Sequence, residues 1–269
     1  MDVDIKGIRY HVDVCGEGFP CLLLHGFTGD ASTWAPFFDD WGKHAKLIVP
    51  DIIGHGRTDS PEGVEHYQIE AAAHDLVGIL DFLGFYQVDL LGYSMGGRLS
   101  LTFALLFPNR VRKLILESSS PGLKSDYERG HRRKKDAELA TFIKEQGIKS
   151  FVDYWEDIPL FKTMRQLPAS IQNRIRAQRL KNSTQGLANS LIGMGTGSQP
   201  SWWNHLNQLN CDVLLLTGSK DQKFCSIAES MLNILKKGTW ISIENTGHAV
   251  HVEYPEKFGT IVSGFLLNA

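Results

Sequence analysis

Cysteine is scarce in this 269-residue sequence, and its four cysteines show no Cys-x-x-Cys spacing. They stand at Cys15, Cys21, Cys211 and Cys225. Scattered thiols of this kind are typical of a protein that stays in a reducing compartment. The sequence also lacks a basic and apolar leader at its start, and no apolar run is long enough to cross a membrane. We therefore expect a cytoplasmic protein without membrane insertion.

A strong charge of either sign is missing as well. The formal net charge is −2, which argues against a general nucleic-acid binder. Within this balance, residues 121–210 carry 14 Lys and Arg against 8 Asp and Glu. A basic segment inside an otherwise acidic chain indicates a small anionic partner. Composition does not distinguish a monomer from a homodimer, so both remain open.

The most informative motif is Gly92-Tyr93-Ser94-Met95-Gly96-Gly97. It joins an apolar run at 88–91, predicted to be a buried strand, to a predicted helix that ends before Pro108. A strand, a sharp Gly-x-Ser-x-Gly turn and a helix together form a nucleophile elbow, which exposes the serine above the sheet edge. The pattern alone also fits a plain glycine-rich turn, so its meaning depends on partners elsewhere in the chain.

Those partners follow in the required order of serine, acid and histidine. Asp221 follows the predicted strand 213–218, and His248 follows the predicted strand 240–243. His248 would accept the Ser94 hydroxyl proton, and Asp221 would fix the imidazole tautomer. The turn His25-Gly26-Phe27 ends another predicted strand. Backbone N–H groups of Phe27 and Met95 would therefore form an oxyanion hole.

A second histidine, His251, raises the question of a metal site. Zinc sites generally use at least three protein ligands, and no others are spaced suitably here, so we expect no metal. No motif indicates a cofactor. The polar residues His25, Asp51, His55 and Arg57 stand at predicted strand ends, where loop structure explains them better than chemistry.

Strands and helices alternate up to about residue 120 and again after residue 210. This alternation predicts an α/β fold with a mostly parallel sheet covered by helices on both faces. Residues between these parts read as helical and enter at the sheet edge that carries Ser94. We therefore expect a core at 1–120 and 211–269, with a helical cap at 121–210 over the site.

These features closely resemble the α/β-hydrolase family along nearly the whole chain, which implies an eight-stranded sheet. Finer motifs are similar to one branch, the MenH enzymes of menaquinone biosynthesis, which are 2-succinyl-6-hydroxy-2,4-cyclohexadiene-1-carboxylate synthases. The more specific matches are residues 92–98 and 247–255. Looser matches include Glu117, residues 121–123 and 159–161, Arg132, Trp155, Arg179 with Asn182 and Gly186, and residues 221–224.

The resemblance implies a lyase. The family's substrate carries a ring carboxylate, a succinyl group and an enolpyruvyl ether, and the enzyme removes a ring proton and expels pyruvate. Arginine suits the recognition of such carboxylates because its guanidinium binds them in a bidentate manner. The substrate contacts that the resemblance implies are Tyr93, Arg98, Arg132, Trp155, Arg179, His25, Lys223 and Phe224.

Two other functions are compatible with the same residues. One is a serine hydrolase that cleaves an ester or a carbon–carbon bond in a small anionic substrate, which would show an acyl-enzyme burst on a chromogenic ester. The other is a ligand-binding receptor of hydrolase shape, which would be stabilised by a ligand that it does not consume.

Overall fold

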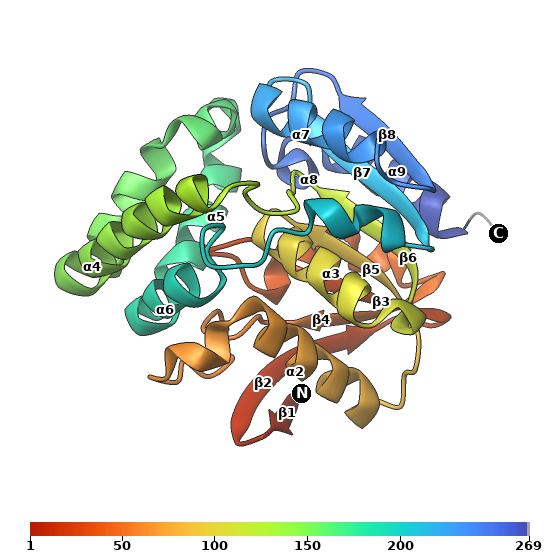
Figure 1. The fold of residues 1–269 in the computed structure, drawn as a ribbon, viewed down its shortest axis with the longest axis horizontal. Helices are drawn as coiled ribbons and strands as arrows, with labels where there is room; N and C mark the ends of the chain where they lie inside the picture. Colours follow the sequence, from red (N-terminus) through yellow and green to blue (C-terminus); the bar gives the residue numbers. More distant parts are fainter. Residues whose placement is uncertain (268–269) are drawn as a thin grey trace.

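The computed structural model describes residues 1–267, and within them eight strands form one sheet in the order β1-β2-β4-β3-β5-β6-β7-β8 (Figure 1). The strands from β4 to β8 are parallel along this order, whereas β2 runs antiparallel to both β1 and β4. Their bounds are β1 Asp2–Ile5, β2 Ile8–Cys15, β3 Phe19–Leu24, β4 Ala45–Pro50, β5 Val88–Tyr93, β6 Val111–Glu117, β7 Asp212–Gly218 and β8 Gly238–Ile243. The prediction of a mostly parallel eight-stranded sheet is confirmed.

Burial along the strands follows their position in the sheet. Every residue of the central strand β5 is buried, as expected for a parallel strand covered on both faces. The edge strand β1 instead alternates exposed and buried residues. It joins β2 through Lys6 and Gly7, whose φ angles of 55° and 84° suit a tight hairpin turn.

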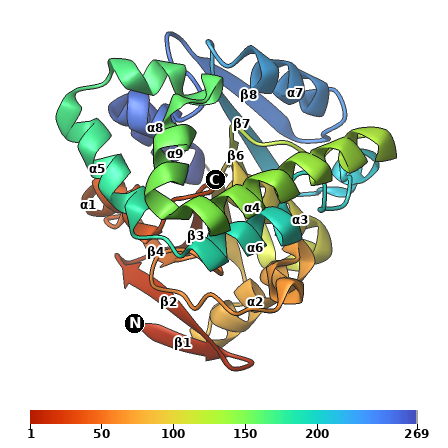
Figure 2. The same cartoon turned by 90° about the vertical axis from the view of Figure 1, so that its left-hand side faces the viewer.

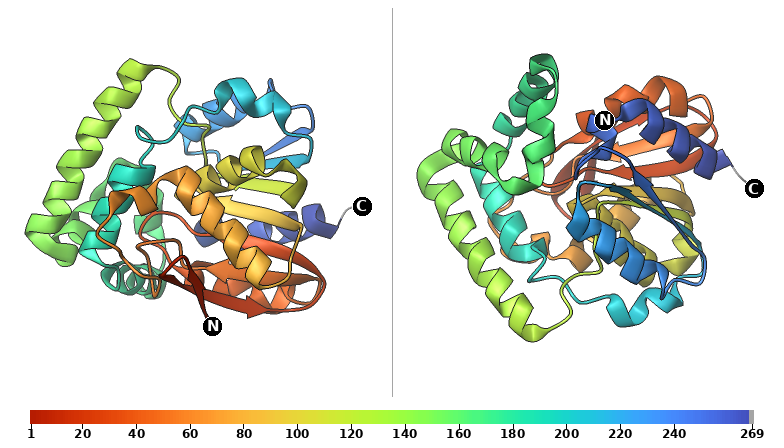
Figure 3. Two further views of the ribbon diagram at one scale, coloured as in Figure 1. Left: turned by 60° about the horizontal axis from the view of Figure 1, so that its bottom comes forward. Right: turned by 90° about the horizontal axis from the view of Figure 1, so that it is seen from above.

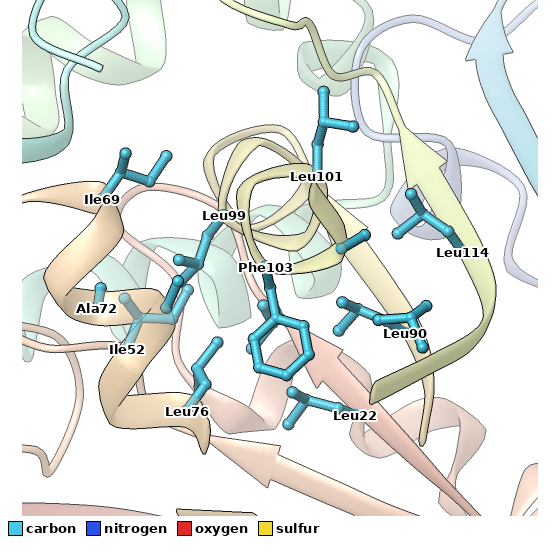
Figure 4. Packing of buried hydrophobic residues seen from close by; sticks show 14 of the residues in the cluster. Leu22, Ile52, Ile69, Ala72, Leu76, Leu90, Leu99, Leu101, Phe103 and Leu114 are labelled. Atoms are coloured by element: carbon cyan, nitrogen blue, oxygen red, sulfur yellow. The ribbon is translucent and has the colours of Figure 1, made fainter. Parts of the chain in front are cut away.

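One face of the sheet is covered by helices α2 (Ile69–Phe82), α3 (Met95–Leu106) and α7 (Gln222–Leu232). Leu76 of α2 and Phe103 of α3 lie beside Leu22 and Leu90 of the sheet (Figure 4), and all four belong to one buried apolar cluster. The opposite face is covered by α1 (Phe38–Trp41) and α9 (Pro255–Leu267), together with the short helical turn Ala31–Phe37. The short helix α8 (Val250–Glu253) precedes α9.

Between β6 and β7 the chain forms helices α4 (Asp126–Asp157), α5 (Ala169–Leu180) and α6 (Thr184–Met194). Figure 2 looks onto these helices, which lie in front of the sheet, and Figure 3 shows them on the side of the molecule away from the C-terminal end of α9. Helices α4 and α6 pack on a small apolar cluster of their own, which includes Ile143, Phe151 and Leu187.

The end of the predicted cap segment returns to the main core before residue 210. Trp203 and Leu206, in the short helical turn Trp203–Gln208, belong to the cluster under α3 and not to the cluster between α4 and α6. Among residues 1–267, no helix combines the length and apolar character needed to span a membrane.

Candidate active site

Ser94 occupies the single residue between β5 and α3, with φ 51° and ψ −104°. A non-glycine residue rarely adopts a positive φ, and this one is imposed by the tight packing of its neighbours. A Cβ added to Gly96 would lie 2.3 Å from the carbonyl oxygen of Leu24, and one added to Gly92 would lie 2.4 Å from that of Gly96. Glycine is therefore required on both sides of the turn, as the elbow motif predicts.

His248 connects Ser94 to Asp221. Its Nε2 lies 2.9 Å from Ser94 Oγ, and its Nδ1 lies 2.6 Å from Asp221 Oδ2. An ionised carboxylate only accepts hydrogen bonds, so Nδ1 carries the proton and Nε2 is free to accept the serine hydroxyl proton. The three side chains come from loops at the carboxyl ends of β5, β7 and β8. The structure thus brings the three predicted residues into one hydrogen-bonded line.

Asp221 is held in place by the start of α7. It is the N-cap residue of that helix and accepts a hydrogen bond from the backbone N–H of Phe224 at 3.4 Å. The Phe224 ring lies 4.6 Å from the His248 ring, measured between centroids. His248 is 2% exposed and Asp221 is 9% exposed. The acid and the base are thus shielded from water, which strengthens the interaction between them.

The predicted oxyanion donors stand on either side of Ser94. Throughout residues 1–267, neither the Phe27 N–H nor the Met95 N–H has a hydrogen-bond acceptor in the protein. Both residues line the pocket that contains Ser94. Unpaired backbone donors beside a nucleophile provide the arrangement that would stabilise a developing oxyanion.

His25 fixes the orientation of the Gly26–Phe27 peptide. Its Nδ1 donates to the Gly26 carbonyl oxygen at 2.8 Å, while its Nε2 accepts from the Ile52 N–H at 2.9 Å. Both bonds form only in the neutral ring with the proton on Nδ1, and burial lowers the pKa of His25 accordingly. In a trans peptide the carbonyl and the following N–H point in opposite directions, so holding the Gly26 oxygen also directs the Phe27 N–H.

This geometry corrects the expectation that His25 contacts substrate. The side chain is completely buried, both ring nitrogens are bonded to backbone, and the residue lines neither pocket near Ser94. His25 instead holds the loop in place, as expected for a polar residue at a strand end. Asp51 has the same role, because it accepts hydrogen bonds from the backbone N–H groups of Ala31 and Arg57.

The Ser94 pocket has a volume of about 180 Å³ and opens between the sheet edge and the helices that follow β6. Six of the eight predicted substrate contacts line it, namely Tyr93, Arg98, Arg132, Trp155, Lys223 and Phe224. Arg179 does not. It lies in a neighbouring cavity, with Nη1 3.4 Å from Glu156 Oε1 and its guanidinium 4.9 Å from the Phe161 ring centre. Arg179 therefore lines a different cavity from Arg132, and its predicted contact with substrate stays a prediction.

The three cations of the Ser94 pocket give it a positive potential. Arg98 Nη1 donates to the Met194 carbonyl oxygen at 2.6 Å and to the Gln199 side-chain oxygen, neither of which carries a charge. Burial lowers the pKa of Arg98 to about 10, which leaves it protonated at neutral pH. In the described chain Lys223 forms no ion pair with a carboxylate.

Arg132 is the only one of the three that is paired with an acid. Its Nε lies 2.8 Å from Oδ1 of the buried Asp136. Burial raises the pKa of that carboxyl group. The three cations outnumber this single carboxylate. The pocket therefore retains an excess of positive charge, and an anionic ligand would be favoured there.

Several pocket residues carry no signal in the sequence. The hydroxyl groups of Ser120, Ser190 and Thr196 and the apolar side chains of Leu191 and Ile227 come from four separate segments. Each lies in an ordinary stretch of loop or helix, and only the three-dimensional arrangement brings them beside Ser94. The basic charge of the segment after β6 was the one feature that indicated a ligand site there.

Comparison with known proteins gives a consistent result. The family model described as alpha/beta hydrolase fold matches residues 20–255. A Bacillus subtilis protein provisionally named 2-succinyl-6-hydroxy-2,4-cyclohexadiene-1-carboxylate synthase is 46% identical over 97% of this chain and 95% of its own. The solved structure of MenH from S. aureus is 35% identical, with a TM-score of 0.91, over 96% of this chain and 97% of that one.

A relative with a different activity is also similar. The 2-hydroxy-6-oxo-2,4-heptadienoate hydrolase of Pseudomonas putida is 29% identical over 97% of this chain and 93% of its own.

Proposed function

Because the chain belongs to the α/β-hydrolase family and, within it, to the 2-succinyl-6-hydroxy-2,4-cyclohexadiene-1-carboxylate synthases of menaquinone biosynthesis, we propose that its Ser94 site is a lyase site. The reaction removes a proton from the ring of an enolpyruvyl precursor and releases pyruvate. Ser94, His248 and Asp221 serve as the catalytic triad, and the N–H groups of Phe27 and Met95 serve as the oxyanion hole.

The observation that carries this proposal is the position of the Ser94–His248–Asp221 line at a pocket with three cations. A plain ester would not require Arg98, Arg132 and Lys223 around the serine. A substrate with several carboxylates would require these cations, because burying a carboxylate without a cation is costly.

The chemistry begins with proton transfer. Ser94 Oγ takes the ring proton that is activated by the succinyl carbonyl, while its own hydroxyl proton moves to His248 Nε2. Asp221 stabilises the imidazolium that results. The electron pair of the broken C–H bond passes into the conjugated system and places negative charge on the carbonyl oxygen. The N–H groups of Phe27 and Met95 stabilise that charge.

The elimination then follows without water. The oxyanion re-forms its carbonyl, and the enolate electron pair forms a new ring double bond. The existing ring double bond shifts by one position toward the carbon that bears the ether, and its electron pair displaces the enolpyruvyl oxygen as the C–O bond breaks. The leaving enolate takes up the proton held by His248 and tautomerises to pyruvate. One proton leaves carbon and one is returned, so His248 and Ser94 end in their starting states.

The direct test is to incubate the protein with the enolpyruvyl precursor and to measure pyruvate through lactate dehydrogenase and NADH oxidation. We expect stoichiometric pyruvate with the unaltered protein and none above background with Ser94→Ala. Equal pyruvate release with and without the protein would overturn the proposal.

The second candidate is a hydrolase, because the same triad geometry serves acyl transfer and because the Pseudomonas putida relative is named a hydrolase. Turnover in water labelled with oxygen-18 separates the two. A lyase leaves no label in the succinyl carboxylate of the product, or in pyruvate quenched before its ketone exchanges. A covalent adduct trapped on Ser94 during turnover would instead establish the hydrolase.

A further inference from the structure

A second cavity lies behind Tyr93 and is called here the Tyr93 side pocket. Its volume is about 80 Å³, and it shares Phe27, Tyr93 and Phe161 with the Ser94 pocket. Neither Ser94 nor His248 lines it. The three shared aromatic side chains therefore lie between the two spaces, and neither Ser94 nor His248 faces the second one.

Two arginines of α5 give this pocket a positive potential. Arg179 is buried and shares its charge with Glu156 at 3.4 Å. Arg174 is exposed, and no carboxylate pairs with it anywhere in the described chain. No Asp or Glu lines the pocket. The cavity therefore has one uncommitted guanidinium and no anion of its own.

His251 adds a polar group that the proposed mechanism does not use. Its Nδ1 lies 2.9 Å from both carboxylate oxygens of Glu117, which also accepts the His251 backbone N–H at 3.1 Å. Glu117 is completely buried at the end of β6. Within the described residues, the other ring nitrogen, Nε2, has no partner and is not fully enclosed. His251 lines the pocket, so Nε2 is available to a ligand there.

The remaining lining limits the size and type of the ligand. Tyr93, Thr28 and Ser32 contribute hydroxyl groups, and Phe161 and Ile175 contribute apolar surface. An anion with a short apolar end would contact both the polar groups and the apolar side chains of the pocket. An inorganic anion would leave Phe161 and Ile175 without a contact. A cavity of this size admits a molecule of only a few heavy atoms.

We propose that the Tyr93 side pocket binds a short 2-oxo carboxylate next to the Ser94 pocket. Arg174 and Arg179 bind the carboxylate, the Tyr93 hydroxyl and His251 Nε2 face the keto oxygen, and the alkyl end lies against Phe161 and Ile175. That the physiological ligand is pyruvate rests on the proposed function, in which pyruvate is released on the other side of Tyr93. The inference that this pocket binds an anion depends only on the residues that line it.

The test is the binding of pyruvate to the resting protein, measured by isothermal titration calorimetry or by ligand-observed NMR at constant ionic strength. Arg174→Gln should weaken binding about tenfold, because a charge-assisted hydrogen bond is lost. The matched control is Lys181→Gln, which removes an exposed charge beside the same helix but outside the pocket. Lys181→Gln should leave the affinity within a factor of two.

Two further binding measurements show which pocket the ligand occupies. Neutral pyruvamide should bind at least tenfold more weakly than pyruvate, and Lys223→Gln, which alters only the Ser94 pocket, should not change pyruvate affinity. If Lys223→Gln weakens binding while Arg174→Gln does not, pyruvate occupies the Ser94 pocket and the proposal is wrong. Equal binding of pyruvamide would also overturn it. Because these measurements need no turnover, they succeed or fail independently of whether the protein releases pyruvate from a precursor.

Discussion

Ser94 Oγ and His248 Nε2 lie 2.9 Å apart although 154 positions separate them in the chain. Ser94 follows β5 and His248 lies in the loop after β8, and these two strands are not neighbours in the sheet.

Replacing either Ser94 or His248 with alanine should reduce turnover by roughly a thousandfold or more. The double variant should be little worse, since the two residues act as one unit. Pyruvate release and thermal unfolding, measured together, check this. Near-normal turnover of Ser94→Ala would exclude a serine-based mechanism.

Asp221→Asn should preserve the fold and remove most of the activity. The amide has nearly the shape of the carboxylate, but its NH₂ group can donate to Nδ1 and would favour the tautomer with the proton on Nε2. Such a ring cannot accept the proton of Ser94, so we expect kcat to fall by roughly a thousandfold or more at neutral pH. A pH profile of kcat with the unaltered protein as reference gives the readout. Retention of more than a tenth of the activity would contradict the assigned tautomer.

Lys223→Gln should act on substrate charge. The variant removes a cation that has no carboxylate partner in the described chain, so folding should be unaffected. We expect kcat/KM for the anionic precursor to fall roughly tenfold, in line with the loss of one partly exposed charge-assisted contact. A neutral ester, if accepted, should be processed at an unchanged rate. Lys236→Gln, on the surface away from the pocket, is the control, and equal losses on both substrates would indicate a structural effect.

His55 should make the protein less stable in acid. Burial lowers the pKa of His55 to about 3 from a usual value of 6.5. The unfolded chain therefore binds a proton below pH 6.5 that the folded chain does not, and stability falls as the pH falls from 6.5 toward 3. Between pH 7.5 and pH 5 the loss from this one residue is about 2 kcal/mol.

The variant His55→Asn isolates this effect, because its amide can still donate to the Ile53 carbonyl oxygen, which His55 Nδ1 approaches to 3.0 Å. Urea unfolding at the two pH values should show a pH-dependent loss about 2 kcal/mol smaller than in the unaltered protein. The exposed His44→Asn should show no such change. An identical pH dependence in all three proteins would mean that His55 is not buried in its neutral form.

The nucleophile elbow could be predicted from sequence because its determinants are local. Gly92, Ser94 and Gly96 stand within five positions, and the apolar runs on either side identify the strand and the helix without tertiary information. The acid and the histidine could be predicted because each follows a recognisable strand, and parallel strands bring their carboxyl ends to the same edge.

The position of the cap side chains could not be predicted in the same way. Arg132 and Arg179 both stand in the basic segment, but they lie on different helices. Arg132 of α4 lines the Ser94 pocket, whereas Arg179 of α5 lies over the Phe161 ring and lines the neighbouring cavity. His25 shows the converse. A histidine after a strand resembles a site residue, and only the two backbone partners of its ring reveal that it orients a peptide instead.

The helices α4, α5 and α6 leave the sheet after β6 and return at β7, and these two strands are direct neighbours, with Glu117 opposite Leu216. The whole insertion is therefore a long connection between two neighbouring strands of the sheet. The entropic cost of closing a loop rises by only about 0.6 kcal/mol for each doubling of its length. Evolution can therefore lengthen, shorten or exchange these helices with little penalty to the sheet that holds Ser94, Asp221 and His248. Divergence in substrate range among proteins built on this sheet should accordingly be concentrated between β6 and β7, where new binding surfaces arise without rebuilding the chemistry.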